Sequence, residues 1–331
     1  MSSKTNIGVT GTGSLIGQAI IKSIRRSGLN EKLELIGFDY FKDTVGSFWC
    51  PINYVLPDIL KKETDEKAWI EFLIGCIREH TIRMLFIGVD FELPLFARHR
   101  ELIESETGCR VLVSAENVIS IANDKYRTYE FLKSNGFYHP KTYLPGEEGI
   151  DTLAYPVIVK PREGARSVGV SLVTNHGDMA LALQQARDPI IQECVGTDTS
   201  EFTCGTIFFD GQLKQLIVLN RTLKAGNTYL SRYRNNYPEV ISRYLKDVCS
   251  VLQPFGACNF QLRLDNEGIP KIFEINSRHS GTTYIRSLFG YMEIEYIINY
   301  VLFGSDYSFN LREGTVVRYF DEFFIPQADG K

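Results

Sequence analysis

The first forty residues pass from a strand pattern through a glycine turn to a helix pattern, and then return to a strand pattern. Residues 7–10 are rich in β-branched side chains, Gly11-Thr12-Gly13-Ser14 follows, and isoleucines recur at helical spacing from Ile16 to Ile24. Further strands are predicted over 33–39, 84–89 and 110–113, with helices over 68–79 and 95–104. Strands that alternate with helices need crossover connections, so the sequence predicts a parallel, doubly wound sheet over residues 1–113.

Beyond residue 113 the pattern changes. Helices are predicted over 115–122 and 125–135, and a strand over 156–160. Asp210-Gly211 separates the apolar runs 202–209 and 213–219 as a tight hairpin turn does, and a second hairpin pairs 257–264 with 271–275. A chain of 331 residues is long enough for about two domains. We therefore expect an α/β domain over 1–113 and an α+β domain over 114–331.

The second hairpin allows its side-chain pairs to be derived. A turn centred on residues 267 and 268 places Gln261 opposite Glu274 and Asn259 opposite Asn276. Because side chains alternate across a strand, these four polar groups share one face. The reverse face is expected to be apolar and to contain Phe260, Leu262, Phe273 and Ile275. One carboxylate and several amide oxygens, with Arg278 nearby, suit Mg²⁺ that bridges phosphates, and the alternative is a polar face in solvent.

A glycine loop over residues 162–169 follows a strand that ends in Lys160. Glycines let successive backbone N–H groups turn toward an anion, and neighbouring basic side chains add positive charge. The residues expected at a phosphate are Lys160, Arg162, Gly164, Ser167 and Gly169, with Arg166 as the alternative to Arg162. The loop is not a P-loop, because Val170-Ser171 stands where that motif requires Lys and Ser or Thr. The alternative is a flexible hairpin tip without a ligand.

The N-terminal glycine motif Gly11-x-Gly13-x-x-x-Gly17 is also compatible with a second function. With Asp39 as ribose acceptor it would bind a nicotinamide dinucleotide, although the third glycine falls one place late for the usual fingerprint. An oxidoreductase built on this turn is therefore kept as an alternative, and a packing turn between strand and helix is the simpler interpretation.

Composition excludes several classes of protein. The formal net charge is −4, from 36 basic and 40 acidic residues, so no overall positive field attracts nucleic acid or an anionic membrane. Seven cysteines and five histidines lack the close spacing of a zinc site. No run of 18 apolar residues occurs. We expect a soluble cytoplasmic protein with reduced cysteines.

Together these segments resemble the ATP-grasp superfamily, and within it the proteins similar to half of the large subunit of carbamoyl phosphate synthetase. The resemblance covers nearly the whole chain. Residues 8–13 and 113–116 are similar to the start and exit of the family's pre-ATP-grasp domain, and residues 123–129 to the helix that opens the grasp region. Residues 157–161 are similar to the lid strand and 191–196 to the adenine hinge. The most specific match is Phe273-Glu274-Ile275-Asn276-Ser277-Arg278, which resembles the family's Glu-x-Asn-x-Arg strand.

The resemblance implies a pre-ATP-grasp domain followed by an ATP-grasp fold with a mobile lid over about 124–193, and bound ATP with Mg²⁺ or Mn²⁺. It implies that Lys125 and Lys160 contact the phosphates and that Arg278 contacts the transferred phosphate. The residues it implies at adenine are Glu193 with the backbone of Cys194 and Val195. Glu201 would hold the ribose, with Asp198 as a weaker candidate, and the residues implied at the metal are Gln261, Glu274 and Asn276.

This resemblance predicts a ligase that activates a carboxylate as an acyl phosphate and joins it to an amine, with both substrates small molecules. A non-catalytic ATP-binding regulator is the further alternative. The chain holds one grasp unit, so carbamoyl phosphate synthesis itself is not implied. Candidates for binding the substrate are Arg221, Arg232, His279 and Arg286. A homodimer is a possible assembly by analogy with the family, and the aromatic run over 319–324 is expected to be a closing strand of the core.

Overall fold

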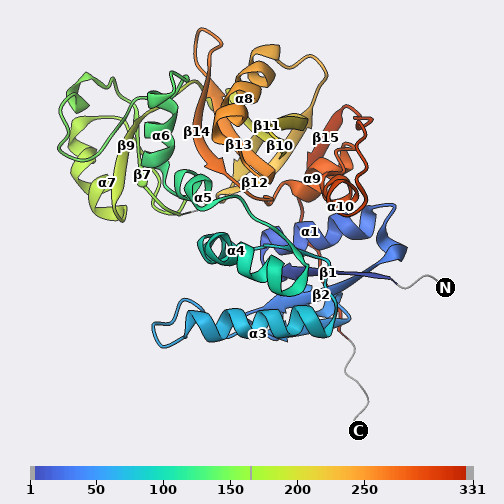
Figure 1. The fold of residues 1–331 in the computed structure, drawn as a ribbon. Coiled ribbons are helices and arrows are strands. Elements are labelled where there is room, and N and C mark those ends of the chain that lie inside the picture. Colours follow the sequence, from blue (N-terminus) through green and yellow to red (C-terminus); the bar gives the residue numbers. More distant parts are fainter. Residues whose placement is uncertain (1–3, 165, 326–331) are drawn as a thin grey trace.

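The computed structural model describes residues 4–164 and 166–325, which form three sheets surrounded by helices (Figure 1). The strands are β1 (Thr5–Thr10), β2 (Leu33–Asp39), β3 (Ile52–Val55), β4 (Met84–Phe86), β5 (Arg110–Leu112), β6 (Thr142–Tyr143), β7 (Val157–Pro161), β8 (Ser171–Val173), β9 (Pro189–Glu193), β10 (Glu201–Phe209), β11 (Gln212–Lys224), β12 (Asn227–Tyr233), β13 (Gly256–Leu264), β14 (Pro270–Asn276) and β15 (Gly314–Val317). The helices are α1 (Leu15–Arg26), α2 (Val45–Trp49), α3 (Glu66–Glu79), α4 (Leu93–Thr107), α5 (Glu116–Asn123), α6 (Lys125–Ser134), α7 (Met179–Gln185), α8 (Glu239–Leu252), α9 (Thr283–Leu288) and α10 (Glu293–Phe303).

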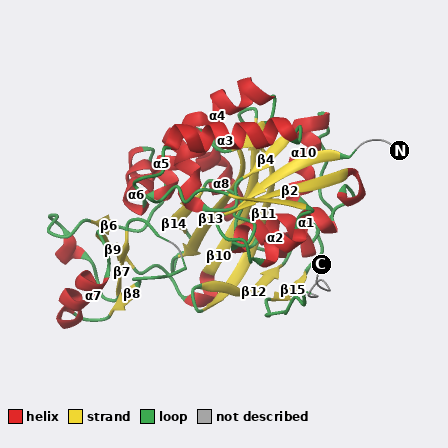
Figure 2. Ribbon diagram, turned by 90° about the horizontal axis from the view of Figure 1, so that it is seen from below, coloured by secondary structure: helices red, strands yellow, loops and turns green. Residues whose placement is uncertain are grey.

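The first sheet is parallel, with the strand order β3-β2-β1-β4-β5, which confirms the predicted doubly wound arrangement. Helices α3 and α4 pack on one face of it through Trp69, Leu73 and Phe96, whereas α1 packs on the other. Figure 2 shows this layering from below. Strand β3 was not predicted, because its four residues are only half-buried and carry little pattern. The strand order reverses between β1 and β4, and a crevice opens at the carboxyl ends of the strands at such a point.

The second sheet is antiparallel, with the order β14-β13-β10-β11-β12-β15. The turn between β10 and β11 confirms the prediction for the first hairpin, because Asp210 and Gly211 both have positive φ angles, of 52° and 70°. Both central residues of a type I′ turn need such angles. Helices α5, α6 and α8 cover one face of this sheet around Phe202, Phe260 and Leu245. The third sheet, β6-β9-β7-β8, is small and carries α7 at one end of the molecule (Figure 1).

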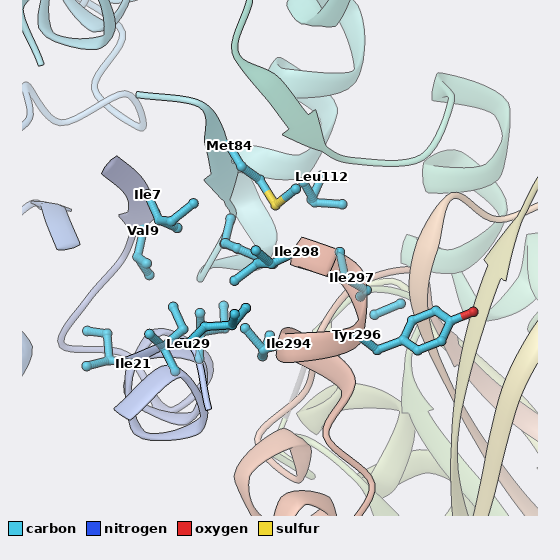
Figure 3. Close-up of a cluster of buried hydrophobic side chains, with 14 of the residues drawn as sticks. Ile7, Val9, Ile21, Leu29, Met84, Leu112, Ile294, Tyr296, Ile297 and Ile298 are labelled. Carbon is cyan, nitrogen blue, oxygen red and sulfur yellow. The ribbon is translucent and has the colours of Figure 1, made fainter. Parts of the chain in front are cut away.

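One hydrophobic core joins the two halves of the chain. Helix α10 belongs to the C-terminal half, yet Ile294, Ile297 and Ile298 are buried beside Ile7 and Met84 of the parallel sheet (Figure 3). The same cluster reaches the antiparallel sheet, where its members are Ile207, Phe209, Ile217 and Leu219. The two sheets are therefore held together by shared apolar burial, at a stabilisation of about 25 cal/mol per Å² of apolar surface.

The aromatic run over 319–324 does not form the predicted closing strand. The last strand, β15, pairs with β12 and ends at Val317. The side chains beyond it are exposed, and Phe320 is 99% accessible. Phe323 meets the ring of Trp49 edge-on, on the side of the N-terminal sheet. The prediction was wrong because a run of aromatic residues is equally compatible with a strand and with a segment that lies along the surface. Within the described residues, no helix combines the length and the apolar character needed to cross a membrane.

Candidate active site

A cavity of about 190 Å³ lies between the small sheet and the antiparallel sheet. Most of the residues predicted at ATP meet here, although they come from α6, β7 and the loop after it, β9 and the hinge after it, β10, β13 and β14. The predicted residues that line it are Lys125, Lys160, Gly164, Ser167, Glu193, Cys194, Val195, Glu201, Gln261 and Glu274. The tertiary fold thus brings together residues that are up to 149 positions apart, from Lys125 to Glu274.

Two buried lysines contribute positive charge to this cavity, which Arg166, Arg221 and Arg263 also line. Lys125 is the first residue of α6 and its Nζ donates to the carbonyls of Arg162 (3.4 Å) and Gly164 (3.0 Å). Lys160 donates to the carbonyl of Phe273 at 3.2 Å. Burial, and secondly the charge of Lys125, lower the pKa of Lys160 to about 7. An ammonium group has three donors, so both lysines keep at least one for an anionic ligand.

The other end of the cavity contains two carboxylates with fixed partners. Glu193 accepts from the backbone N–H of Lys141 at 2.9 Å and from Lys271 at 3.0 Å. Glu201 lies between two guanidinium groups, accepting from Arg221 at 2.8 Å and from Arg263 at 2.8 and 2.9 Å. Asp198, the weaker ribose candidate, is bonded to the outer side of Arg263, is 94% exposed at its side chain and does not line the cavity. The geometry therefore favours Glu201 over Asp198.

The hairpin β13–β14 confirms the derived side-chain pairs. Gln261 is opposite Glu274 and Asn259 is opposite Asn276. Glu274 Oε1 accepts from Gln261 Nε2 at 3.3 Å and from Asn276 Nδ2 at 3.0 Å. Asn259 is buried and accepts from Thr203 at 2.9 Å, and together with Asn276 it lines a neighbouring cavity.

Phe273 departs from the prediction for the reverse face of this hairpin. A bulge follows Gln261, so that Leu262 pairs with Ile272 and Phe273 is left over. Because a bulge offsets the alternation of side chains, Phe273 lines the cavity instead of the core. The ammonium group of Lys160 lies 5.3 Å from the centre of its ring.

A second cavity, of about 400 Å³, lies at the crevice of the parallel sheet. Its walls come from the loops after β1 and β4 on one side and from β13, β14 and the residues after β14 on the other. Asn276 and Arg278 line this cavity, and four residues line both cavities, namely Arg166, Arg221, Gln261 and Glu274. The polar face of the hairpin is thus the boundary between the two cavities.

Arg162 and Gly169 lie outside the cavities, contrary to the prediction for the glycine loop. The Arg162 guanidinium makes a bidentate pair with Asp124, at 2.5 Å and 3.2 Å. Burial disfavours the charged form of Asp124, but Arg162 and the N–H groups of Tyr126 and Arg127 hold its pKa below the usual value. Gly169 packs against Pro161. Arg162 thus holds the base of the loop, because its charge is already paired with Asp124.

Three of the four predicted substrate residues also lie away from the cavities. Arg286 is 1% exposed and bonds Glu293 through Nε at 2.6 Å and Asn259 through Nη1 at 3.0 Å. His279 Nδ1 lies 2.7 Å from Glu293 Oε1. Burial alone would raise the pKa of Glu293, but Arg286 and His279 lower it to about 2. Arg232 lies on β12, where it pairs with Asn220 and Thr315. Of the four, only Arg221 lines a cavity.

The N-terminal glycines form a packing turn. A Cβ on Gly17 would lie 2.1 Å from the carbonyl oxygen of Gly11, so α1 can approach β1 only with glycine there. The Asp39 carboxylate is buried and accepts from Thr12 Oγ1 at 2.8 Å and from the N–H of Gly13 at 2.5 Å. Because this carboxylate is enclosed by its own turn and lines neither cavity, the geometry argues against a nicotinamide site.

The donor set at the hairpin fits Mg²⁺ that is shared with phosphates. Among residues 4–164 and 166–325, no three His, Cys, Asp or Glu side chains gather closely enough to hold a metal alone. Glu274 contributes a carboxylate, and the amide oxygens of Gln261 and Asn276 accept from Arg221 (2.7 Å) and Arg278 (2.9 Å). Mg²⁺ prefers hard oxygens and commonly takes only one or two protein carboxylates, with phosphate and water completing its shell.

The comparison with known families agrees with this arrangement. Residues 122–282, which include Lys125, Lys160 and the hairpin, match the ATP-grasp domain family. Residues 122–282 form an ATP-grasp domain. The parallel sheet that precedes it has the position of the pre-ATP-grasp domain expected from the sequence, and the fold prediction is confirmed.

The relatives of this chain are distant. It is 36% identical over 98 residues to the uncharacterized protein MG011 of Mycoplasma genitalium. This match covers 29% of this chain and 33% of that protein. It is 30% identical over 152 residues to a D-alanine–D-alanine ligase of Polaromonas naphthalenivorans, 42% of this chain and 44% of the ligase. The match thus spans less than half of each relative. A structure of N5-carboxyaminoimidazole synthetase from Staphylococcus aureus complexed with ADP has the same fold, with a TM-score of 0.74, 16% identity, and 96% of this chain and 83% of that one covered.

Sequence reasoning missed several residues of the ATP-grasp site. Arg263 lies two positions after Gln261 on β13, so the alternation of side chains could have placed it on the same face. Asp90, which accepts from Arg278 Nε at 2.5 Å, comes from the loop after β4 in the other sheet. Arg318 lines the second cavity from the segment after β15. No local sequence pattern predicts that Asp90 or Arg318 belongs to the site.

Proposed function

We propose that the protein is an ATP-dependent ligase that phosphorylates a small carboxylic acid and joins it to an amine, releasing ADP and phosphate. The observation that carries this proposal is the shared boundary of the two cavities, because Glu274 and Gln261 line both. Nucleotide phosphates in the first cavity would there meet an acceptor in the second. The similarity to a D-alanine–D-alanine ligase supports the same reaction class.

The mechanism requires positioning and charge neutralisation more than a nucleophilic side chain. A carboxylate oxygen of the acceptor attacks the γ-phosphorus, ADP leaves, and the amine nitrogen then attacks the acyl carbon and expels phosphate. Lys125 and Lys160 would hold the phosphates from the first cavity. When bound at Gln261, Glu274 and Asn276, Mg²⁺ would neutralise negative charge on the phosphate oxygens.

Arg278 would stabilise the transferred phosphoryl group from the second cavity. Its Nε is held by Asp90 at 2.5 Å, and its Nη1 and Nη2 donate to His279 O (3.0 Å) and Asn276 Oδ1 (2.9 Å). Donors that are fixed before the reaction cost no reorganisation when charge develops. This anchoring therefore suits a group that acts on the transition state.

The loop over 162–169 would exclude water from the acyl phosphate. Residues of this loop line the first cavity, whose 190 Å³ falls below the 300 to 1,000 Å³ or so typical of ligand pockets. We expect a bound nucleotide to occupy this space together with the open mouth of the cavity. The contact of the loop with the turn after β11 is close, because a Cβ on Gly226 would lie 2.0 Å from the carbonyl oxygen of Arg166.

The test of the proposed reaction is ADP release from Mg·ATP across a matrix of carboxylic acids crossed with amines. The acids include amino acids, sugar acids and bicarbonate. We expect at least one pair to raise ADP release above the background and to yield one amide per ADP by mass spectrometry. Mg·ATP binding without stimulation by any pair would favour the non-catalytic regulator instead. NAD(P) binding without ATP binding would favour the oxidoreductase.

Lys160 predicts a pH dependence of nucleotide binding. Since its pKa is about 7, a fraction of the side chain is neutral at pH 8 and protonated when a polyanion binds. Binding of Mg·ADP should therefore take up protons above pH 7, and affinity should fall as the pH rises from 7 to 9. Titration calorimetry in buffers of different ionisation enthalpy measures this uptake.

Two variants distinguish Lys160 from other titrating groups. K160M should remove most of the proton uptake at pH 8, because no neutral amine remains to be protonated. K246M changes an exposed lysine on α8 and should leave the uptake unchanged. Equal proton uptake in K160M and the unmodified protein would assign the proton to another group.

A further inference from the structure

The second cavity has an excess of positive charge. Its described charged residues are Asp90, Arg166, Arg221, Glu274, Arg278 and Arg318. Arg221 pairs with Glu201 at 2.7 Å, and Arg278 pairs with Asp90 at 2.5 Å. Arg166 belongs to the loop over the first cavity, and Glu274 belongs to the proposed metal site. Arg318 also lines the second cavity. It forms no ion pair with the described residues and has no role in the proposed mechanism.

Arg318 lacks an acidic partner in the described part of the chain. No carboxylate of residues 4–164 or 166–325 lies within 4.0 Å of its guanidinium, and its Nη2 donates to the carbonyl of Gly281. A guanidinium carries five N–H donors, so others remain for a ligand. Burial lowers the pKa of Arg318 from its ordinary value, which reflects a cation partly removed from water without a compensating anion.

The position of Arg318 is fixed by the backbone. Its N–H donates to the carbonyl of Tyr229 at 2.7 Å, which extends the pairing of β15 with β12 by one residue. Gly281 lies between this arginine and α1, because a Cβ there would be 4.0 Å from Arg318 Nη2 and 2.7 Å from Leu15 Cδ2. Leu15 and Phe91 also line the cavity and give it an apolar wall. The charge therefore lies on a defined wall of the second cavity.

A second cation lies near Arg318. Burial, and secondly the charge of Arg318, lower the pKa of Lys22 on α1, whereas Asp321 opposes this effect. Lys22 also lies 4.3 Å from the centre of the Tyr284 ring. Lys22 does not itself line the cavity, so the positive charge that faces a ligand at this end is that of Arg318.

We propose that Arg318 binds an oxyanion, carboxylate or phosphate, that belongs to the acceptor substrate and is separate from the carboxylate that is activated. The acceptor is accordingly a small molecule with two anionic groups, one at Arg278 and the boundary of the cavities and the other at Arg318. This inference rests on the proposed function, which makes the second cavity the acceptor site. A planar guanidinium matches either oxyanion through two parallel hydrogen bonds.

The test uses equilibrium binding and therefore needs no knowledge of the natural substrate. The protein is first saturated with Mg·AMP-PNP, whose measured affinity reports on the nucleotide site alone. Glutarate, its mono-amide and 4-phosphonobutyrate are then titrated as probes by calorimetry. We expect both dianions to bind at least about 10-fold more tightly than the mono-amide, since hydrogen bonds between charged groups are worth more than neutral ones. The tighter of the two identifies the oxyanion as carboxylate or phosphate-like.

The variants R318Q and R318K assign the preference to this side chain. R318Q should weaken dianion binding about 10- to 100-fold, leave the mono-amide unchanged, and leave AMP-PNP affinity unchanged. R318K should restore part of the affinity, because it keeps the charge without the planar fork. R312Q removes an exposed arginine of the same segment and is the matched control. Its melting temperature and that of R318Q should agree within a few degrees.

Two results would overturn the inference while leaving the proposed function intact. One is equal binding of dianions and mono-amide to the unmodified protein, and the other is equal weakening of all probes in R318Q. Failure of AMP-PNP to bind would instead count against the proposed function itself. Once a substrate is known, R318Q should raise its KM with little change in kcat, because the oxyanion at Arg318 takes no part in bond making.

Discussion

Replacing Glu274 with glutamine is expected to lower ATP-dependent ADP release about 10²- to 10³-fold. Glu274 supplies the carboxylate of the proposed metal site, and its Oε1 is already oriented by Gln261 at 3.3 Å and Asn276 at 3.0 Å. E274Q keeps the size of the side chain but removes its negative charge, so the attraction for Mg²⁺ is lost while the hairpin remains. The measurement is steady-state ADP release with the best pair of the substrate matrix, at several Mg²⁺ concentrations.

The matched control is E267Q, which changes an exposed glutamate in the turn of the same hairpin. It should retain full activity and show the same Mg²⁺ dependence as the unmodified protein. Folding of E274Q is checked by its melting temperature, which should change little because Glu274 is only half-buried. Full activity in a correctly folded E274Q would remove the hairpin from the mechanism.

The variant R286M is expected to lose about 3–5 kcal/mol of folding free energy. Arg286 is 1% exposed, and it holds the fully buried carboxylate of Glu293 through Nε at 2.6 Å and Nη2 at 3.0 Å. Without the guanidinium, Glu293 becomes a buried charge whose remaining partners are His279 and Thr283. Gly205 makes room for this pair, since a Cβ there would lie 2.6 Å from Arg286 Nε. Chemical denaturation at pH 7 measures the loss.

The pH dependence of stability gives a second signature of this pair. In the unmodified protein the pKa of Glu293 is about 2, below its unfolded value, so its contribution is present above about pH 4.3 and is lost as the pH falls toward 2. In R286M, burial dominates and raises the pKa of Glu293. The deficit of R286M should therefore shrink as the pH is lowered from 7 toward 5, because protonation then removes the buried charge.

Two further variants control for this effect. R243M breaks the exposed pair between Arg243 and Glu239 on α8, at 3.5 Å, and should cost less than about 1 kcal/mol. The double variant R286M/E293Q should be less destabilised than R286M, since no unpaired buried carboxylate remains. A loss in R286M no larger than that in R243M would show that the buried pair contributes little.

The sequence predicted the parts of the site that lie within one hairpin. The pairs Gln261–Glu274 and Asn259–Asn276 followed from the turn position and the period of two in a strand, and the register confirms both. Phe273 failed the same reasoning because a bulge after Gln261 shifts the alternation by one, and no residue type announces a bulge. The alternation of strands and helices over 1–113 was equally local, and the parallel sheet confirms it.

The roles of the charged residues could not be read in this way. Arg162, Arg221 and Arg286 are alike in sequence, but the first is paired with Asp124, the second lies between both cavities, and the third is enclosed with Glu293. Whether an arginine is free for a ligand depends on which carboxylate lies within a few ångströms. That carboxylate belongs to another element in each case, so the assignment needs the assembled fold.

The sequence by itself determined the alternation of strands and helices over residues 1–113, the ATP-grasp resemblance and the polar face of β13–β14, because each of these depends on local periodicity or on a contiguous motif. Only the tertiary structure decided that α10 packs on the N-terminal sheet, that Asp90 holds Arg278 across the two sheets, and that Arg318 faces the second cavity. The physical reason is that burial and pairing are properties of side chains brought together from distant parts of the chain. The −4 net charge illustrates this, since an acidic chain gathers several of its arginines around one cavity.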